Sequence, residues 1–386
     1  MESIIENPFK NKKYGLYIHI PFCFKKCPYC AFNVNIIKNI PEKNYLKRLK
    51  EEMNPHRNKK FKTVYIGGGT PNLMSNDFYK ELFEIIDISS SEEITIELNP
   101  EFFTEKQLKF YSSLGINRFS LGIQTFSGKG LKILGRTHKN KDSFRAIDLL
   151  KGFNFSIDLI YGYPRQTLYD LSKDLEIIKI YTPPHLSIYN LTYEEGSFFN
   201  KWKRQGKLTP LNDDLELKMY LKINEILKET ELKRYEISNF AQKGHKSVHN
   251  MIYWTSGPYI GIGSGAHSYY YEESKGIIRS EKERKLRKYL NLPLYLTEDK
   301  NILTRKEYIF DKFYSEMRKL YIDINKFKKE TKVDLFKLIT DNDLFKIIRD
   351  FIVFKDDKIL FTEKGIINSD TVFEVFYDII EKTDDL

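Results

Sequence analysis

The chain has 386 residues, a net charge of +10 at neutral pH, 41% hydrophobic residues and 15% aromatic residues. This apolar content is enough for a sizeable core, which excludes a disordered protein. The sequence contains no apolar run of eighteen residues, so we expect no transmembrane segment, and residues 1–13 lack the apolar core of a signal peptide. The lysines are spread along the whole chain, so the charge gives little support to nucleic-acid binding, and we expect no nucleic acid as a partner.

The first strand-like run, Gly15–Ile20, leads into a loop that holds every cysteine of the chain, Cys23, Cys27 and Cys30. Structural zinc usually has four protein ligands, and an ordinary [4Fe–4S] cluster takes four cysteines. Three thiolates on one loop therefore indicate a [4Fe–4S] cluster with one iron open to another ligand. The alternatives are a zinc site completed by a histidine such as His19, and three unrelated thiols. Since no cysteine remains for a disulfide, we expect a cytoplasmic protein.

Five further strand-like runs follow, with amphipathic segments of helical length between them. The runs cover residues 63–66, 94–98, 118–123, 155–160 and 186–191, and the helical segments cover about 41–54, 76–88, 104–114, 127–151, 167–181 and 212–230. Thr104 and Gln107 have the spacing of a capping box at the start of the third helix. This alternation predicts the α/β class with a parallel sheet, and six strand–helix units suit a partial (β/α)6 barrel of the TIM type.

One face of the predicted strands is aliphatic and the other is polar. In the first strand Ile18 and Ile20 share a face that His19 does not, and the polar faces of the later strands carry Glu97, Gln124 and Asp158. Because buried polar groups need partners, we expect these side chains to line a lumen that holds a polar ligand. In barrels of this kind such sites lie at the C-terminal ends of the strands.

The pattern changes after residue 230, which predicts four parts of the chain. Residues 231–280 are rich in Gly and aromatic residues and suggest irregular loops and short strands, and residues 281–303 suggest a charged linker. Residues 304–386 are mostly helical in pattern and end with two short strands at 351–354 and 358–361, around Asp356 and Asp357. We therefore expect a barrel over residues 1–230, an extension, a linker and a small C-terminal α+β domain of winged-helix type.

Further motifs stand at the ends of the predicted strands. The first, Gly67-Gly-Gly-Thr-Pro71, lets backbone N–H groups approach a ligand without obstruction by Cβ atoms. The others follow in chain order: Glu97-Leu-Asn-Pro100, Leu121-Gly-Ile-Gln124, Leu134-Gly-Arg136 and Asp158-Leu-Ile-Tyr-Gly162. Each alone is explained by a tight turn, a surface ion pair or a helix cap. Together with the C-x3-C-x2-C triplet they resemble the radical S-adenosylmethionine (SAM) superfamily and, within it, the coproporphyrinogen-oxidase-like branch.

The resemblance implies that the open iron of the cluster chelates SAM and that the strand ends bind the rest of this cofactor. The residues implied in SAM binding are Tyr17, Gly68, Gly69, Thr70, Glu97, Gln124, Arg136 and Asp158. Arg136 can pair with the carboxylate of SAM, and Glu97 and Asp158 can accept hydrogen bonds from its amino and ribose hydroxyl groups. Tyr29 would shield the cluster loop.

Two families share this frame. The oxygen-independent coproporphyrinogen III dehydrogenases have a longer N-terminal extension and a further cysteine two residues after the triplet, whereas here 22 residues precede Cys23 and position 32 is Phe32. The heme chaperones called HemW lack that cysteine and carry an H-N-x-x-Y-W motif. This chain has His249-Asn-Met-Ile-Tyr253-Trp254, between Tyr235–Ala241 and Gly261–His267, and so resembles HemW. Ala31 and Ser268 depart from the usual residues of that family.

This second resemblance implies a heme site at the hexapeptide His249–Trp254. His249 can ligate iron through a neutral imidazole, and Tyr253 and Trp254 can stack on a porphyrin, while His267 is a second candidate ligand. The alternative is that His249 bonds to other protein groups and the aromatic residues fill a core. Because the hexapeptide follows the last barrel strand, we expect it to lie beyond the barrel and apart from the SAM pocket.

The sequence therefore predicts a heme chaperone that binds [4Fe–4S], SAM and heme and hands heme to an acceptor protein, with a flavodoxin or ferredoxin as candidate reductant. We expect no coproporphyrinogen dehydrogenase activity. The enzyme alternative is that dehydrogenase, in which a 5′-deoxyadenosyl radical abstracts hydrogen from propionate side chains before decarboxylation. A third alternative, a transcriptional or RNA-associated protein using the C-terminal domain, has only the net charge in its favour.

Overall fold

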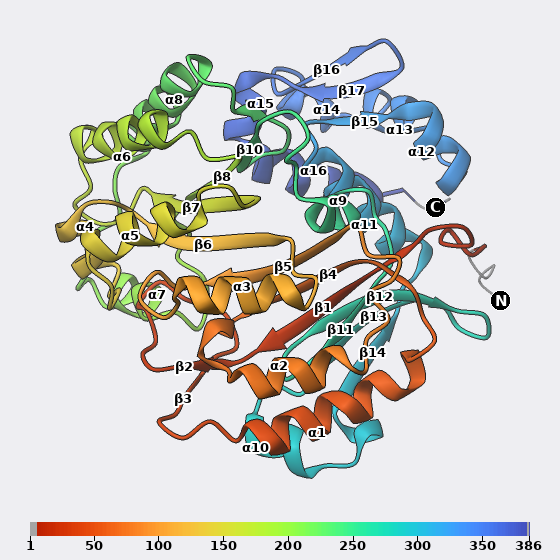
Figure 1. Cartoon of the computed structure of the whole chain (residues 1–386). Coiled ribbons are helices and arrows are strands. Elements are labelled where there is room, and N and C mark those ends of the chain that lie inside the picture. Colours follow the sequence, from red (N-terminus) through yellow and green to blue (C-terminus); the bar gives the residue numbers. More distant parts are fainter. Residues whose placement is uncertain (1–5, 384–385) are drawn as a thin grey trace.

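Strands from distant parts of the chain form one large sheet in the computed structural model, which describes residues 6–383 and Leu386 (Figure 1). The first five residues of the polar N-terminal segment 1–13 lie outside this description. The sheet has twelve strands in the order β14-β13-β12-β11-β1-β4-β5-β6-β7-β8-β10-β9. Its six central strands are parallel: β1 (Tyr14–Ile20), β4 (Phe61–Gly68), β5 (Glu93–Leu98), β6 (Arg118–Gln124), β7 (Phe155–Tyr161) and β8 (His185–Asn190). The predicted α/β class and the six predicted strands are confirmed.

Helices cover the outer side of these strands (Figure 1), because the aliphatic side chains of each strand need an apolar partner. They are α1 (Glu42–Met53), α2 (Asn76–Phe83), α3 (Glu105–Ser113), α5 (Asn140–Leu150), α6 (Leu168–Tyr181) and α8 (Asp213–Lys228). Leu16, Ile18 and Ile20 are fully buried in the core between the sheet and the helices. The capping box of α3 is confirmed, since Thr104 and Gln107 bond reciprocally to each other's backbone N–H.

The single helix predicted over 127–151 is wrong. Two helices, α4 (Gly128–Ile133) and α5, stand there, and the segment between them contains Gly135 with a positive φ of 71°. A Cβ atom at Gly135 would lie 2.4 Å from Pro28 of the cysteine loop, so only glycine allows this close approach. The break in the helix therefore brings Arg136 next to the cysteines.

The segment after residue 230 lengthens the sheet at both edges. β9 (Lys233–Arg234) and β10 (Asn239–Ala241) add antiparallel strands beside β8, whereas β11 (Tyr259–Ile262) pairs parallel with β1. β12 (His267–Glu272), β13 (Gly276–Lys282) and β14 (Glu298–Ile302) continue antiparallel from β11. This region is more regular than the loops and short strands that the sequence predicted.

Residues 281–303 are not a separate linker. They contain α10 (Leu286–Asn291), the 3-10 turn η3 (Leu294–Leu296) and strand β14, which pairs with β13. Arg48 of α1 donates from Nε to the carbonyl oxygen of Tyr289 at 2.8 Å. The charged residues that suggested a linker therefore belong to an edge strand and to a helix fixed on α1.

The C-terminal part has its own core and its own small sheet. The helices are α11 (Arg305–Met317), α12 (Ile324–Thr331), α13 (Leu335–Thr340), α14 (Phe345–Ile348), α15 (Glu363–Ile367) and α16 (Ser369–Glu381). The strands are β15 (Tyr321–Asp323), β16 (Ile352–Lys355) and β17 (Lys358–Phe361), in the order β15-β17-β16. The two predicted strands are confirmed, and β15 is an addition. Asp356 and Asp357 both have positive φ, as a two-residue hairpin of type I′ requires.

Shorter elements complete the described chain. They are β2 (Phe22–Cys23), β3 (Asn35–Ile36), α7 (Phe198–Arg204), α9 (Val248–Trp254) and the 3-10 turns η1 (Asn54–His56) and η2 (Pro71–Leu73). Within residues 6–383, no helix has both the length and the apolar character needed to cross a membrane.

Candidate functional site

The three cysteines lie on the loop that leaves the C-terminal end of β1, and their side chains are partly exposed. The glycine-rich turn after β4 supports this loop. Gly69 N donates to the Ile20 carbonyl at 2.8 Å, and a Cβ atom at Gly69 would lie 3.0 Å from Cys23 Sγ and 2.7 Å from the Phe22 carbonyl oxygen. Cys23 Sγ is also 3.3 Å from Thr70 Oγ1. The turn Gly67–Thr70 is thus the platform on which the first cysteine lies.

The donor set suits an iron–sulfur cluster better than zinc. Both imidazole nitrogens of His19 are engaged, with Tyr17 Oη at 2.8 Å and with the Asn33 carbonyl at 2.8 Å, so His19 has no free nitrogen for a metal. In the described part of the chain, no group of three Cys, His, Asp or Glu side chains is already drawn together as a metal site. Burial raises the pKa of Cys30 to about 11, and a bound metal favours the thiolate.

Glu97 lies at the end of β5, on the inner face of the sheet. Tyr65 donates from its hydroxyl to Glu97 Oε1 at 2.8 Å, and Gly68 N donates to Oε2 at 3.0 Å. Burial raises the pKa of Glu97 to about 7, while the bonds from Tyr65 and Gly68 oppose the rise. Near neutral pH this carboxyl can therefore exist in either protonation state and can accept hydrogen bonds from a cationic or amino group.

Gln124 is the last residue of β6, and Asp158 lies in the middle of the neighbouring strand β7, opposite Gly122. Asp158 accepts from Ser120 Oγ at 2.7 Å and from Ser156 Oγ at 2.9 Å. Gln124 has a φ of +71°, and the pairing of β6 with β7 shifts register at this point. Glu97 and Gln124 thus lie at or next to the C-terminal ends of their strands, whereas Tyr17 and Asp158 lie in the middle of theirs; that these four line one lumen stays a prediction.

Arg136 connects the strand ends with the cysteine loop. Its Nη2 donates to Asn99 Oδ1 at 2.7 Å and to the Gly122 carbonyl at 3.0 Å, and its Nη1 lies 3.9 Å from Cys27 Sγ. Burial acts to lower the pKa of Arg136, but Tyr29 and Cys27 outweigh it and raise that pKa. Asn99, which the sequence analysis did not single out, also donates to Thr70 Oγ1 at 3.2 Å. Its position in the motif Glu97-Leu-Asn-Pro100 could have identified Asn99 as a site residue.

The hexapeptide does not lie beyond the barrel. It forms helix α9 on the inner face of β1 and β4, where the ring of His249 stacks on Tyr65 with centroids 5.1 Å apart. Gly15 of β1 permits this approach, because a Cβ atom there would lie 3.1 Å from Ile252 and 3.3 Å from His249. The separation from the SAM pocket that we expected is therefore wrong, since Tyr65 touches both His249 and Glu97.

His249 is a buried, fully bonded histidine in this structure. Its Nδ1 is 2.7 Å from Thr63 Oγ1 and its Nε2 is 2.7 Å from Tyr253 Oη. Burial lowers the pKa of His249 to about 3, so the ring is neutral, and one ring nitrogen donates while the other accepts. These contacts are those of the alternative in which His249 bonds to protein groups.

The other candidate heme residues lie in different surroundings. The ring of Trp254 faces the guanidinium of Arg318 at 4.4 Å, and Arg318 follows α11 of the C-terminal part. His267 starts β12 and is exposed, with Nε2 3.6 Å from Glu281. Ahead of it, the glycine-rich loop contacts the segment after the cysteines, since Asn33 Nδ2 donates to the Ser264 carbonyl at 2.9 Å. His267 therefore lies near the rim of the site, while His249 lies inside.

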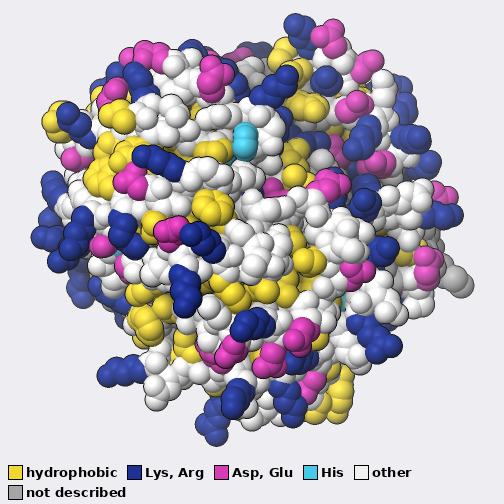
Figure 2. All heavy atoms as spheres, viewed as in Figure 1, with side chains coloured by type: hydrophobic (Ala, Val, Ile, Leu, Met, Phe, Trp, Pro, Cys, Tyr) yellow, Lys and Arg dark blue, Asp and Glu magenta, His cyan; other side chains and the backbone are white. Residues whose placement is uncertain are grey.

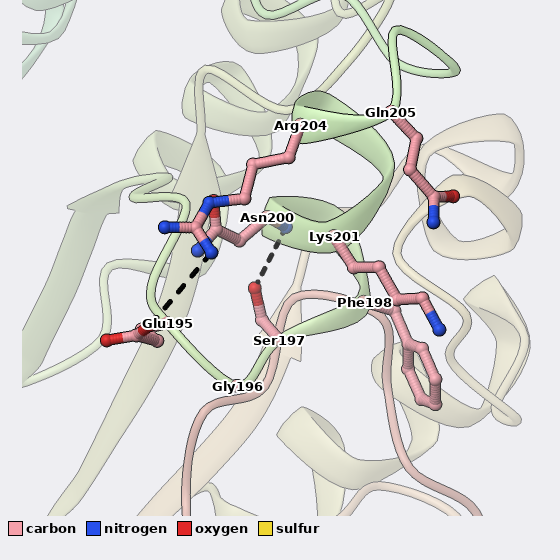
Figure 3. A pocket seen from close by; sticks show the side chains of 8 residues that line it. All are labelled: Glu195, Gly196, Ser197, Phe198, Asn200, Lys201, Arg204 and Gln205. Atoms are coloured by element: carbon pink, nitrogen blue, oxygen red, sulfur yellow. Dashed lines mark hydrogen bonds and ion pairs between the residues drawn. The ribbon is translucent and has the colours of Figure 1, made fainter.

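A surface cavity of about 400 Å³ lies at α7 and is lined by residues between Glu195 and Gln205 (Figure 3). It contains none of the predicted site residues. Helix α7 nevertheless touches the site from outside, because Phe199 N donates to the Pro28 carbonyl at 2.9 Å.

Comparison with known proteins identifies the family of this chain. Residues 17–178 match the Radical SAM superfamily. The heme chaperone HemW of Lactococcus lactis is 33% identical over 374 residues, which are 95% of this chain and 97% of the relative. HemW of Buchnera aphidicola from Schizaphis graminum is 37% identical over 339 residues, or 85% of this chain and 88% of the relative.

Among solved structures, coproporphyrinogen III oxidase (HemN) from Escherichia coli covers 97% of this chain and 91% of its own length, with a TM-score of 0.78 and 20% sequence identity. At that identity the likeness shows the fold alone. The identity to the HemW relatives extends over most of the chain and shows the family as well as the fold. This chain belongs to the HemW family within the radical SAM superfamily.

Proposed function

We propose that this protein is a heme chaperone that binds a [4Fe–4S] cluster, SAM and heme, and that it passes heme to an acceptor protein. The observation that carries the proposal is the meeting of the cysteine loop, the Gly67–Thr70 turn, Glu97 and Arg136 at one end of the parallel strands. The names of the HemW relatives support the heme part. The three free cysteines favour a reducing compartment, and we place the protein in the cytoplasm.

Cys23, Cys27 and Cys30 are the residues that would hold the cluster. When bound, the cluster supplies an open iron that takes the amino and carboxylate groups of SAM. The protein residues orient the rest of this ligand: Arg136 offers its positive charge to the carboxylate, and Glu97 accepts from the amino group. Asp158 can accept hydrogen bonds from the ribose hydroxyls if Ser120 or Ser156 gives up its hydrogen bond to this carboxylate. Gly68 and Gly69 let the turn pack against His19 and the cysteine loop, since a Cβ atom would lie 2.5 Å from His19 at Gly68 and 2.7 Å from the Phe22 carbonyl oxygen at Gly69.

The heme site is proposed at α9 and the rim. His249 can ligate iron only if it breaks its hydrogen bond to Thr63 or to Tyr253. The exposed His267 has no buried hydrogen bond to break. We therefore expect His267→Ala to change the Soret spectrum of bound heme if the rim histidine is the ligand. His249→Ala should change it if α9 rearranges. A spectrum that is unchanged in both variants would show that neither histidine ligates the iron.

Coproporphyrinogen III dehydrogenase is the second candidate, and the shared fold with HemN is the observation in its favour. Phe32, which stands where that family has a further cysteine, argues against it. The deciding experiment uses anaerobically reconstituted protein, and it measures heme retained after gel filtration and SAM-dependent release of carbon dioxide from coproporphyrinogen III. The chaperone retains about one heme per chain and releases no carbon dioxide. Turnover without heme retention would establish the enzyme instead.

A further inference from the structure

Tyr65 of β4 stands between the SAM face and the heme motif. One face of its ring stacks on His249 of α9, with an interplanar angle of 30°. Its hydroxyl donates to Glu97 at 2.8 Å. Glu97 has two hydrogen-bond donors in the described chain, Tyr65 and Gly68 N, so the position of its carboxylate depends on where Tyr65 lies.

His249 in turn is fixed by several contacts. Thr63, two residues before Tyr65 on the same face of β4, bonds to one ring nitrogen, and Tyr253 bonds to the other. The start of α9 is held by Glu93, which accepts from Val248 N and His249 N at 2.9 Å each. A movement of His249 therefore removes the surface on which Tyr65 rests.

A second chain of hydrogen bonds joins the same helix to the other carboxylate of the SAM face. Asp158 accepts from Ser156, whose hydroxyl is 3.0 Å from His185 Nδ1. His185 Nε2 is 2.8 Å from Tyr235 Oη, and this hydroxyl accepts from Ser247 N, at the N-cap of α9, at 3.2 Å. Glu97 and Asp158 are thus both connected to α9 through buried side chains.

We propose that Tyr65 is a positioning residue that couples helix α9 to Glu97, so that a change at the hexapeptide changes the affinity for SAM. The inference rests on the proposed function in that SAM is taken as the ligand of Glu97. The inference goes beyond the proposed function, because it couples the heme motif to the residues proposed to bind SAM. Tyr65 acts through Glu97 and does not itself bind SAM.

A double-mutant cycle tests the coupling, with SAM affinity of the reconstituted protein measured by calorimetry. Tyr65→Phe removes one hydrogen bond to a carboxylate and should weaken SAM binding about tenfold. His249→Ala removes the stacking surface and should weaken it severalfold. In the Tyr65→Phe background, His249→Ala should add less than about a twofold further loss, because the hydroxyl through which it acts is already gone.

The controls keep the helix and the sheet intact. Met251→Leu conserves volume on α9, and Tyr14→Phe removes a hydroxyl from the far end of β1, and both should leave SAM affinity unchanged. If His249→Ala fails to fold, Thr63→Val replaces it in the cycle, since it releases one ring nitrogen of His249 without changing the side-chain shape much. Circular dichroism and iron content confirm that each variant is folded and loaded.

The outcomes separate the two ideas. Losses that multiply across the cycle, with wild-type protein binding SAM, overturn the coupling and leave SAM binding in place. Wild-type protein that takes up iron but has no affinity for SAM overturns the proposed function and the coupling with it. A non-multiplicative cycle with silent controls supports both.

Discussion

Single residues decide whether the cysteine loop can hold the proposed cluster. Cys23, Cys27 and Cys30 are the only cysteines of the chain, so no other thiolate can replace a lost one. We expect each change to Ala to reduce iron and sulfide in the reconstituted protein to below about a tenth of the wild-type content, since a cubane cluster needs at least three protein thiolates here. Chemical analysis of both elements checks this. Cluster content near the wild-type value in any of the three would contradict the assignment.

The pKa of Glu97 predicts how the affinity for SAM depends on pH. Its pKa is raised to about 7 by burial, opposed by the Tyr65 and Gly68 bonds. A raised carboxyl pKa means that the protonated form prevails below about pH 7, where the carboxylate is lost as an acceptor. SAM affinity should therefore rise about tenfold from pH 6 to pH 8, as the carboxylate forms.

The amino group of SAM titrates too, so the comparison with Glu97→Gln isolates the contribution of Glu97. The ratio of wild-type to variant affinity, measured by calorimetry at each pH, should grow with pH through 7. A ratio that stays constant from pH 6 to pH 8 would show that Glu97 does not act through its charge.

At the scale of elements, helix α9 depends on a buried carboxylate. Glu93 of β5 accepts from the first two N–H groups of α9 and lies 3.8 Å from Arg118 Nε. Glu93→Ala leaves Arg118 and these amides buried without a partner, so we expect a loss of about 3 kcal/mol in the free energy of unfolding. Its neighbour Glu92 makes an exposed ion pair with Lys62 at 3.6 Å, and Glu92→Ala should cost less than about 1 kcal/mol. Urea denaturation of both variants checks the difference.

The elements also show what the sequence could predict. The six parallel strands follow from local patterns, because each carries an aliphatic face that a helix must cover. The position of α9 does not follow from local patterns. It depends on contacts with Gly15 and Glu93, which lie more than 150 residues away in sequence, and nothing in the sequence around these two residues indicates the contacts. Likewise Gly135 has the usual signature of a helix end, yet its reason, the approach of Pro28, is a tertiary contact. Residues 281–303 resembled a linker because many of them are charged. An edge strand such as β14 is also expected to carry charged side chains, so the charge does not distinguish the two.

At the scale of the whole molecule, the chain carries a net charge of +10. Lys and Arg side chains stand among apolar ones on the flank of Figure 2 where Figure 1 places α4 and α7. Helix α7 exposes Phe198 and Trp202, whose rings stack with centroids 6.1 Å apart, next to Lys201, Lys203 and Arg204. Because α7 is hydrogen-bonded to Pro28 of the cysteine loop, an electron donor bound on α7 would lie close to the cluster proposed there.

We therefore expect an acidic electron carrier of the flavodoxin or ferredoxin kind to associate through α7. The double variant Lys201→Glu/Arg204→Glu should lower the second-order rate of cluster reduction by about tenfold at low salt, because opposite charges steer association. This difference should shrink as salt is raised, since screening removes the attraction of exposed charges. The matched control, Lys346→Glu/Arg349→Glu, makes the same change in net charge on exposed side chains of the C-terminal part. Stopped-flow reduction of all three proteins measures the effect, and an equal loss in both double variants would mean that total charge, and not the surface of α7, guides the donor.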